Sequence, residues 1–294
     1  MHRIKMLRHY GVEPYVVFDG DYLPSKLRTE DSRASKRAEY LSSGLRFHAQ
    51  NNKAKANEQF QKCIDITPEM AYRFILALRR EGTAYVVAPY EADAQLAYLE
   101  KTGIIQAIVT EDSDLLVFGC KTLLLKLGQF GDCVEIKRER FGKVTGQITL
   151  HGFTDEDFRH MAILSGCDYL ASINGVGLIT AHRLLRWNKN IPKVFLSSFL
   201  LLIMKVIQSL RMRLGSRVPP DYMDSFNRAN LTFQHQRVFC PEKECLVMWN
   251  QPDKPLPDEI LVYIGVYMLL LMMLITGILM LKLLEELLEG NCIP

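Results

Sequence analysis

The chain has 294 residues, of which 48% are hydrophobic, so it can bury one large core, or one core and a small module. Its net charge of +3 is too small to identify a polyanionic partner, so evidence for nucleic-acid binding must come from where the charges lie. Seven cysteines without a CxxC pair disfavour a disulfide framework and indicate reduced thiols. A zinc site at Cys240 and Cys245 would need two more ligands, and no suitably spaced histidine or cysteine supplies them.

The two ends of the sequence are unusual. Residues 1–14 carry basic side chains but no apolar signal segment, and we interpret them as a helix that begins in the middle of a protein. At the other end, Ile260 to Leu281 contains no charge and is long enough to span a bilayer. A tail-anchored membrane protein is therefore one alternative, although the acidic residues that follow give no positive-inside signal.

Short apolar runs separated by helix-like segments predict an α/β fold with a parallel sheet. The expected strands, in chain order, are Tyr15 to Phe18, Ala84 to Ala88, Ala107 to Val109 and Leu123 to Leu127. A helix is expected over Ala94 to Lys101. Between the first two strands, residues 25–80 form a largely helical insertion that is much longer than a crossover requires.

Acidic residues follow three successive strands, at the sheet edge where sites form in parallel α/β folds. A further aspartate lies where a downstream helical module could close over that edge. The six candidate ligands are Asp19, Glu91, Asp93, Asp112, Asp114 and Asp168. Because negative charges so close together repel one another, such a cluster must take up protons or bind cations. Oxygen donors without nearby histidine or cysteine favour two Mg²⁺ ions, with Mn²⁺ as an alternative, and such a pair can hydrolyse phosphodiesters.

Each acid taken alone has a simpler interpretation. Glu91 and Asp93 have the placement of first-turn acids that complement a helix dipole. Asp19 with Gly20 is typical of an ordinary turn, and Asp112 with Asp114 is typical of Asx-turn chemistry. The metal-site interpretation depends on all six residues converging in space.

The helical insertion is locally basic. From Lys26 to Lys55 there are eight Lys or Arg residues against three acids. On a helix, Lys26, Arg33 and Arg37 would share one face, close to the Asp19 loop. Such a face could offset the charge of a scissile phosphate, whereas the alternative is an ordinary solvated basic surface.

A second helical module is expected downstream. A helix pattern over Asp155 to Cys167 is followed by a loop and by Gly175-Val176-Gly177, which opens another helix. This pattern is typical of a helix-hairpin-helix whose backbone amides approach a phosphate closely, although a plain helix-helix turn has the same spacing. After Val218 the sequence predicts a turn-rich region without clear helices or strands.

The strings VVFDG, APYEADAQLAYL, TEDSDLL, ILSGCDYL and INGVG together resemble the XPG-type structure-specific nucleases, the flap endonuclease family, and most of all its exonuclease 1 branch. The resemblance covers about residues 10–250. It implies a PIN-like α/β nuclease core over residues 1–150 with a helical arch at about 25–80. It also implies a helix-two-turn-helix module within residues 151–250, followed by an atypical apolar tail at 251–294.

The same resemblance assigns roles to residues. The six acids would bind two Mg²⁺ ions, and Lys26 and Arg33 would contact the scissile phosphate as catalytic residues. The set expected to bind DNA is Arg37, Gly175, Val176 and Gly177. A K⁺ ion is expected near Ser165 and Ser172.

The function that the resemblance implies is 5′-to-3′ exonuclease and flap endonuclease activity on double-stranded DNA with 5′ ends, nicks or flaps. It also implies work in DNA repair in the nucleus, with mismatch-repair and replication-clamp proteins as partners and no membrane association. Three departures qualify this expectation: the family's first strand and its aspartate are absent, Asn190 to Met204 does not follow the family pattern, and the tail is unlike the family. A catalytically impaired fragment that binds DNA is therefore the second alternative.

Overall fold

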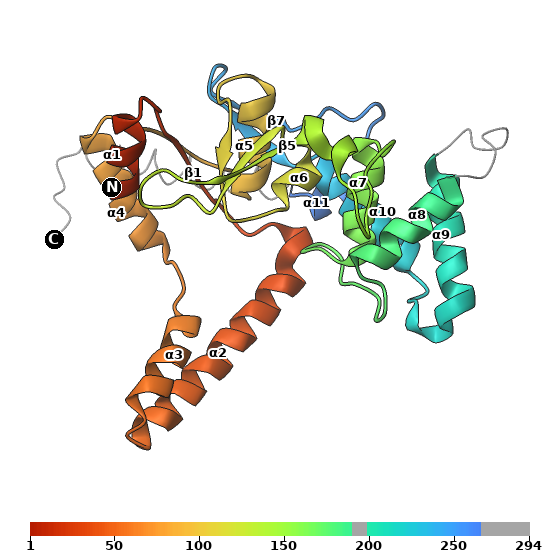
Figure 1. The fold of residues 1–294 in the computed structure, drawn as a ribbon, viewed down its shortest axis with the longest axis horizontal. Helices are drawn as coiled ribbons and strands as arrows, with labels where there is room; N and C mark the ends of the chain where they lie inside the picture. The colour runs from red at the N-terminus through yellow and green to blue at the C-terminus, as the bar shows by residue number, and fades with distance from the viewer. Residues whose placement is uncertain (190–198, 266–294) are drawn as a thin grey trace, which may run out of the picture.

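A computed structural model describes residues 1–189 and 199–265 (Figure 1). In chain order its elements are α1 (His2–His9), β1 (Tyr15–Phe18), η1 (Pro24–Lys26), α2 (Leu27–Ala49), α3 (Lys53–Cys63), α4 (Pro68–Arg80), β2 (Ala84–Val87), α5 (Ala92–Lys101), β3 (Ile108–Val109), α6 (Leu115–Phe118), β4 (Thr122–Leu125), β5 (Val134–Lys137), η2 (Arg138–Lys143), α7 (Asp155–Ser165), α8 (Leu178–Lys189), α9 (Phe199–Leu214), η4 (Gly215–Arg217), α10 (Tyr222–Gln234), β6 (Arg237–Cys240), β7 (Cys245–Met248) and α11 (Asp258–Tyr263). The α/β class expected from the sequence is confirmed, and the four expected strands appear as β1 to β4 within one or two residues of their predicted ends.

The strands of the α/β region form two separate small sheets. β1 pairs with β2 in parallel, with Tyr15 opposite Ala84 and Phe18 opposite Val87. β3 pairs with β4 in parallel, and β4 pairs with β5 antiparallel. Because β1 and β2 run in the same direction, the loops that follow them leave from the same edge, and these loops carry Asp19 and Glu91.

Local side-chain bonds fix where several helices begin. The Thr154 hydroxyl accepts a hydrogen bond from the Asp157 N–H at 3.1 Å, and the Asp157 carboxylate accepts one from the Thr154 N–H at 2.7 Å, which completes a capping box for α7. Asn52 caps α3 and Thr67 caps α4, where Pro68 occupies the first turn. These caps explain why helices start there and not one turn earlier.

Two helices of the insertion, α2 and α3, form an arm that projects from the body of the protein, whereas α4 lies on the body beside α1 (Figure 1). α2 and α3 pack antiparallel along this arm. A Cβ atom added to Gly44 of α2 would lie 2.6 Å from the ring of Phe60 in α3, so only glycine allows this close approach. The base of α2 joins the body next to η1, and the arm therefore starts at the sheet edge that bears the acids.

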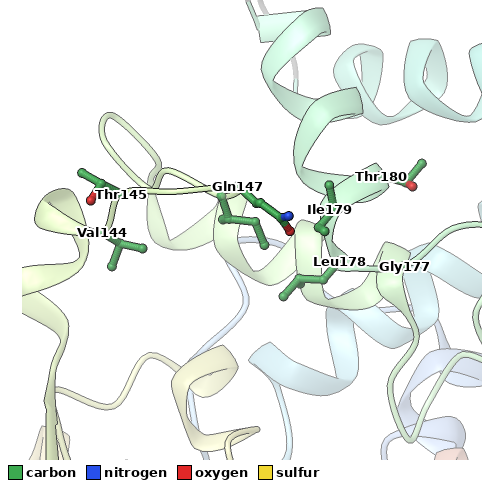
Figure 2. A pocket seen from close by; sticks show the side chains of 8 residues that line it. Val144, Thr145, Gln147, Gly177, Leu178, Ile179 and Thr180 are labelled. Atoms are coloured by element: carbon green, nitrogen blue, oxygen red, sulfur yellow. The ribbon is translucent and has the colours of Figure 1, made fainter.

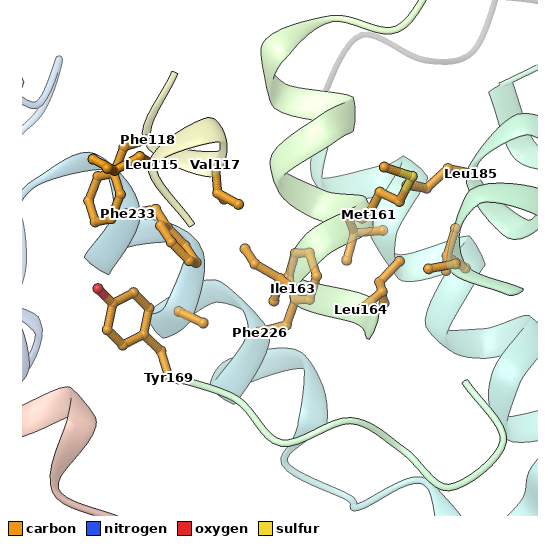
Figure 3. Close-up of a cluster of buried hydrophobic side chains, with 14 of the residues drawn as sticks. Leu115, Val117, Phe118, Met161, Ile163, Leu164, Tyr169, Leu185, Phe226 and Phe233 are labelled. Atoms are coloured by element: carbon orange, nitrogen blue, oxygen red, sulfur yellow. The ribbon is translucent and has the colours of Figure 1, made fainter. Parts of the chain in front are cut away.

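One apolar core runs through the described residues from Leu23 to Trp249. Its centre is shown in Figure 3, where side chains of α6, α7, α8 and α10 meet. Phe118 and Phe233 pack edge to face with ring centroids 5.1 Å apart. The expected nuclease core and downstream module thus share their packing, and the boundary at residue 150 stays a prediction.

The region after Val218 differs from the sequence expectation. It contains a regular helix, α10, and an antiparallel hairpin, β6 and β7, instead of irregular turns. Of the unusual stretch Asn190 to Met204, residues from Phe199 belong to α9, whose Ile203 is fully buried, and residues 190–198 lie outside the described part of the chain.

Most of the apolar tail, residues 266–294, also lies outside the described residues. Its first residues pack onto the body, since Ile264 is fully buried and the Gly265 carbonyl accepts a hydrogen bond from the Tyr90 hydroxyl. Within the part of the chain that the structure describes, no helix has the length and apolar character needed to cross a membrane.

Candidate functional site

The loop after β1 is joined to the loop after β2. The Asp19 carboxylate accepts a hydrogen bond from the Ala92 N–H at 2.8 Å, at the start of α5, and the Gly20 N–H donates to the Tyr90 carbonyl at 2.6 Å. A Cβ atom at Gly20 would lie 2.0 Å from the Ala88 carbonyl oxygen, so only glycine fits here. Asp19 is thereby fixed beside the Glu91 loop.

The six predicted acids come together at this edge. Asp93 interacts electrostatically with Glu91, Asp112 and Asp19, and Asp114 does so with Asp112, Asp168 and Glu91. Burial, reinforced by these like charges, raises the pKa of Asp93 to about 7 and that of Asp114 to about 6. The six acids thus lie within electrostatic range of one another, while their role as metal ligands stays a prediction.

The loop after β3 is ordered by its own side chains. The Asp112 N–H donates to the Thr110 hydroxyl at 2.9 Å, and the Asp114 N–H donates to Asp112 Oδ1 at 2.9 Å. This Asx-type geometry matches the simpler interpretation of the pair. It also positions Asp114 at the start of α6, where its carboxyl lies in the electrostatic range of Asp168.

Two cations from the base of the arm reach into the acidic cluster. Lys26 Nζ lies 2.6 Å from Glu91 Oε1 and 2.9 Å from Asp168 Oδ2. Burial alone would lower the pKa of Lys26, but the Glu91 and Asp168 carboxylates outweigh it and raise this pKa, so the ammonium stays charged. Arg33 NH2 lies 2.9 Å from the same oxygen of Asp168, and its NH1 pairs with Glu30 at 2.8 Å.

Arg37 faces a different partner. Its guanidinium lies 3.0 Å from Asp65 Oδ2, in the segment that joins α3 to α4. The three cations expected on one face thus divide into Lys26 and Arg33, which contact the acids, and Arg37, which ties the arm to its return segment.

Two polar residues of the site were not identified from the sequence. The Tyr169 hydroxyl donates a hydrogen bond to Glu91 Oε2, and Gln236 Nε2 donates to the same oxygen at 3.0 Å. Tyr169 is 9% exposed and Gln236 is completely buried. Burial and the Glu91 charge raise the pKa of Tyr169 well above its usual value, so the phenol stays protonated and donates.

The donor chemistry suits hard divalent cations, because every acidic ligand candidate offers carboxylate oxygen. The pKa values of Asp93 and Asp114 are raised first by burial and then by the neighbouring carboxylates. Within residues 1–189 and 199–265, however, no three acidic, histidine or cysteine groups stand close enough together to hold a metal as they are arranged. Cys240 and Cys245, opposite each other on β6 and β7, are both free thiols.

The downstream hairpin lies between α7 and α8. Gly175 adopts a φ of +92°, which permits the tight turn, while the Val176 side chain is buried and its N–H donates to the Ile173 carbonyl at 2.8 Å. A hollow of about 710 Å³ opens beside the start of α8 (Figure 2). Its lining residues are Val144, Thr145, Gln147, Ile148, Gly177, Leu178, Ile179 and Thr180.

Ser165 and Ser172 lie close together. The Ser165 hydroxyl donates to the Ala162 carbonyl at 2.8 Å, and a Cβ atom at the adjacent Gly166 would lie 2.8 Å from the Ser172 Cβ. The expected K⁺ site at these two serines stays a prediction.

Comparison with known proteins agrees with this geometry. The XPG N-terminal domain matches residues 1–40, and the XPG I-region matches residues 82–168, which contain five of the six acids. The chain is 42% identical over 265 residues to Exodeoxyribonuclease 1 of Schizosaccharomyces pombe, covering 90% of this chain and 44% of that protein. It is 45% identical over 269 residues to Exonuclease 1 of Xenopus laevis, covering 90% of this chain and 35% of that protein.

The chain thus spans less than half the length of these relatives. Its fold is similar to the catalytic core of Rad2 in complex with DNA substrate, with a TM-score of 0.51 and 21% sequence identity, over 77% of this chain and 68% of that chain. Together, the two matched domains and the extended identity confirm the family resemblance of the motifs, and the chain belongs to the XPG-type family.

Proposed function

We propose that the chain is a magnesium-dependent DNA nuclease that hydrolyses phosphodiester bonds, with 5′-to-3′ exonuclease and flap endonuclease activity in nuclear DNA repair. The observation that carries the proposal is the convergence of six acids with Lys26 and Arg33 at one edge of the fold. The names of the relatives, Exonuclease 1 and Exodeoxyribonuclease 1, support the reaction. The DNA-bound state of the Rad2 core supports the substrate class.

The roles of the side chains follow from their chemistry. Two Mg²⁺ ions held by the acids would lower the pKa of a water and stabilise the leaving oxygen of the phosphodiester. Lys26 and Arg33 would leave their carboxylate partners and offset the charge of the scissile phosphate. The hairpin at Gly175 and Gly177 would hold the duplex by its backbone, and a K⁺ ion near Ser165 and Ser172 would bridge that contact.

The test is single-turnover cleavage of 5′-flap and recessed-end duplexes with Mg²⁺, comparing the full chain with its Asp114→Ala variant. We expect the variant to lose cleavage while keeping most of its DNA affinity, because the Asp114 carboxylate would take part in catalysis and not in DNA binding. Unchanged turnover would remove Asp114 from the site.

A second function is favoured by one observation. Two of the six acids, Glu91 and Asp168, pair with Lys26 or Arg33, and within the described residues no three acids are close enough together to hold a metal. The alternative is therefore a DNA-binding protein without cleavage. DNA binding by the full chain with no cleavage in Mg²⁺, unrestored by Mn²⁺, would support this alternative.

A further inference from the structure

Glu91 is held from two sides. Its Oε1 lies 2.6 Å from Lys26, and its Oε2 accepts hydrogen bonds from the Tyr169 hydroxyl and from Gln236 Nε2. Gln236 Nε2 also donates to the Tyr169 oxygen at 2.8 Å, which closes a ring of three bonds among the three side chains. The carboxylate therefore has one oxygen fixed by neutral donors and one oxygen facing a cation.

The direction of each bond in the ring is determined. Turning the Gln236 amide over would place its carbonyl oxygen against the Glu91 carboxylate, and two acceptors repel. The Tyr169 hydroxyl has one proton, which goes to Glu91 because Gln236 already donates to its oxygen. Both neutral groups thus donate to the same oxygen of Glu91, Oε2.

Both donors are anchored by packing. The Tyr169 ring packs edge-on against Phe233 with centroids 4.7 Å apart (Figure 3). The Gln236 backbone is held by the Trp249 N–H, which donates to its carbonyl at 2.8 Å. The ring of Tyr169 and the backbone of Gln236 are thus both tied to the surrounding fold.

The two donors also come from outside the matched family domains, which end at residue 168. Tyr169 follows directly, and Gln236 lies between α10 and β6. The carboxyl-terminal part of the described chain therefore contacts the acidic cluster through the buried side-chain amide of Gln236, which donates to Glu91.

We propose that Tyr169 and Gln236 are positioning residues for the acidic pocket, holding the Glu91 carboxylate oriented so that its Oε1 faces the cation position. The inference rests on the proposed function in one respect, that the pocket binds divalent cations. Partners that orient a ligating carboxylate act on metal affinity through the ligand, and their loss costs roughly 10- to 100-fold in affinity or activity.

The test is a calorimetric titration of the full chain with Mn²⁺, with Tyr169→Phe and Gln236→Leu as variants. Tyr169→Phe removes only the hydroxyl and keeps the ring on Phe233. We expect each variant to weaken Mn²⁺ binding by about 10-fold or more. The double variant should lose little beyond either single variant, because the ring acts as one unit.

Gln95 offers a matched control. It is completely buried and hydrogen-bonds the same hairpin, donating from Nε2 to the Phe239 carbonyl at 2.8 Å and accepting from the Phe239 N–H at 2.7 Å. The Gln95→Leu variant should lower the unfolding temperature to a similar degree as Gln236→Leu. Its Mn²⁺ affinity should stay at the wild-type value.

The outcomes separate the two proposals. Wild-type Mn²⁺ affinity in both ring variants overturns the positioning role, and so does an equal loss in Gln95→Leu, which would trace the effect to hairpin packing. If the wild-type chain cuts no DNA but the ring variants still bind Mn²⁺ more weakly than it does, the proposed nuclease function is overturned and the positioning role is kept. A full chain that binds no Mn²⁺ overturns both.

Discussion

The Lys26 ammonium lies 2.6 Å from Glu91 Oε1, so a cation at the base of the arm neutralises a carboxylate in the loop between β2 and α5. Lys26 and a divalent cation would therefore compete for the same oxygens. We expect Lys26→Met to bind Mn²⁺ several-fold more tightly in a calorimetric titration, and to cleave DNA at least about 10-fold more slowly.

Lys36→Met is the matched control, because Lys36 is exposed on α2 and the substitution removes the same charge. It should leave both quantities near their wild-type values. Weaker Mn²⁺ binding in Lys26→Met would mean that the ammonium helps to assemble the acids instead of competing for them.

Asp93→Asn is expected to stabilise the protein at neutral pH without divalent cations. The pKa of Asp93 is raised from 3.8 to about 7 by burial and by Glu91 and Asp112. The stabilising contribution of Asp93 to folding is therefore fully present below pH 3.8, and it is lost as the pH rises toward about 7 and the buried carboxyl ionises. The substitution should recover up to about 4 kcal/mol at pH 7, measured by urea unfolding.

The pH dependence provides the control for this variant. The gain should shrink as the pH falls toward 4, and the exposed Asp31→Asn variant should show no comparable change. Added Mg²⁺ should stabilise the wild type more than Asp93→Asn, since binding to the folded state adds stability. An Asp93→Asn variant less stable than wild type at pH 7 would contradict the raised pKa.

Gly20→Ala should damage the site through packing. The new Cβ would lie 2.0 Å from the Ala88 carbonyl oxygen, so the loop bearing Asp19 must move away from the loop bearing Glu91. We expect a loss of at least about 1–3 kcal/mol in thermal or urea unfolding, together with a large loss of cleavage. Gly142→Ala, where an added Cβ meets nothing within 4 Å, should change neither.

Substitutions of Arg33 and Arg37 should affect different properties, the first the rate of cleavage and the second the stability of the arm. Arg33→Ala removes a contact with Asp168 and should slow single-turnover cleavage by about 10-fold or more, with a small effect on unfolding. Arg37→Ala breaks a partly exposed ion pair with Asp65, which contributes about 0.2–1 kcal/mol at most. If Arg37 acts only through this pair, Asp65→Ala should lower the free energy of unfolding as much as Arg37→Ala does, and the double variant should lower it no further. A larger loss of DNA affinity in Arg37→Ala than in Asp65→Ala would support direct contact between Arg37 and DNA.

The sequence predicted the acidic half of the site because its signals are local. A carboxylate directly after a buried strand is visible in the order of residues, and parallel strands then bring such residues to one edge. Arg37 was grouped with Lys26 by helix spacing, but spacing does not reveal that Asp65 approaches from another segment.

Tyr169 and Gln236 could not be found this way. A tyrosine at a loop and a glutamine before a strand look like ordinary core and turn residues, and only the fold shows that both donate to Glu91. α10 was missed for a related reason, since its Asp, Asn, Ser and Thr residues favour helices weakly. Burial of Tyr222, Phe226 and Phe233 on one face stabilises it.

The acidic pocket draws on chain segments that are made at widely different times during synthesis. Asp19 is translated early, whereas Asp168 and Gln236 emerge only after most of the described fold has left the ribosome. A nascent or proteolysed fragment that ends just before α10 therefore lacks Gln236, whose buried side-chain amide donates to Glu91 in the full chain. Under the proposed function, such a fragment would bind divalent cations more weakly than the finished chain, although it already contains all six acids.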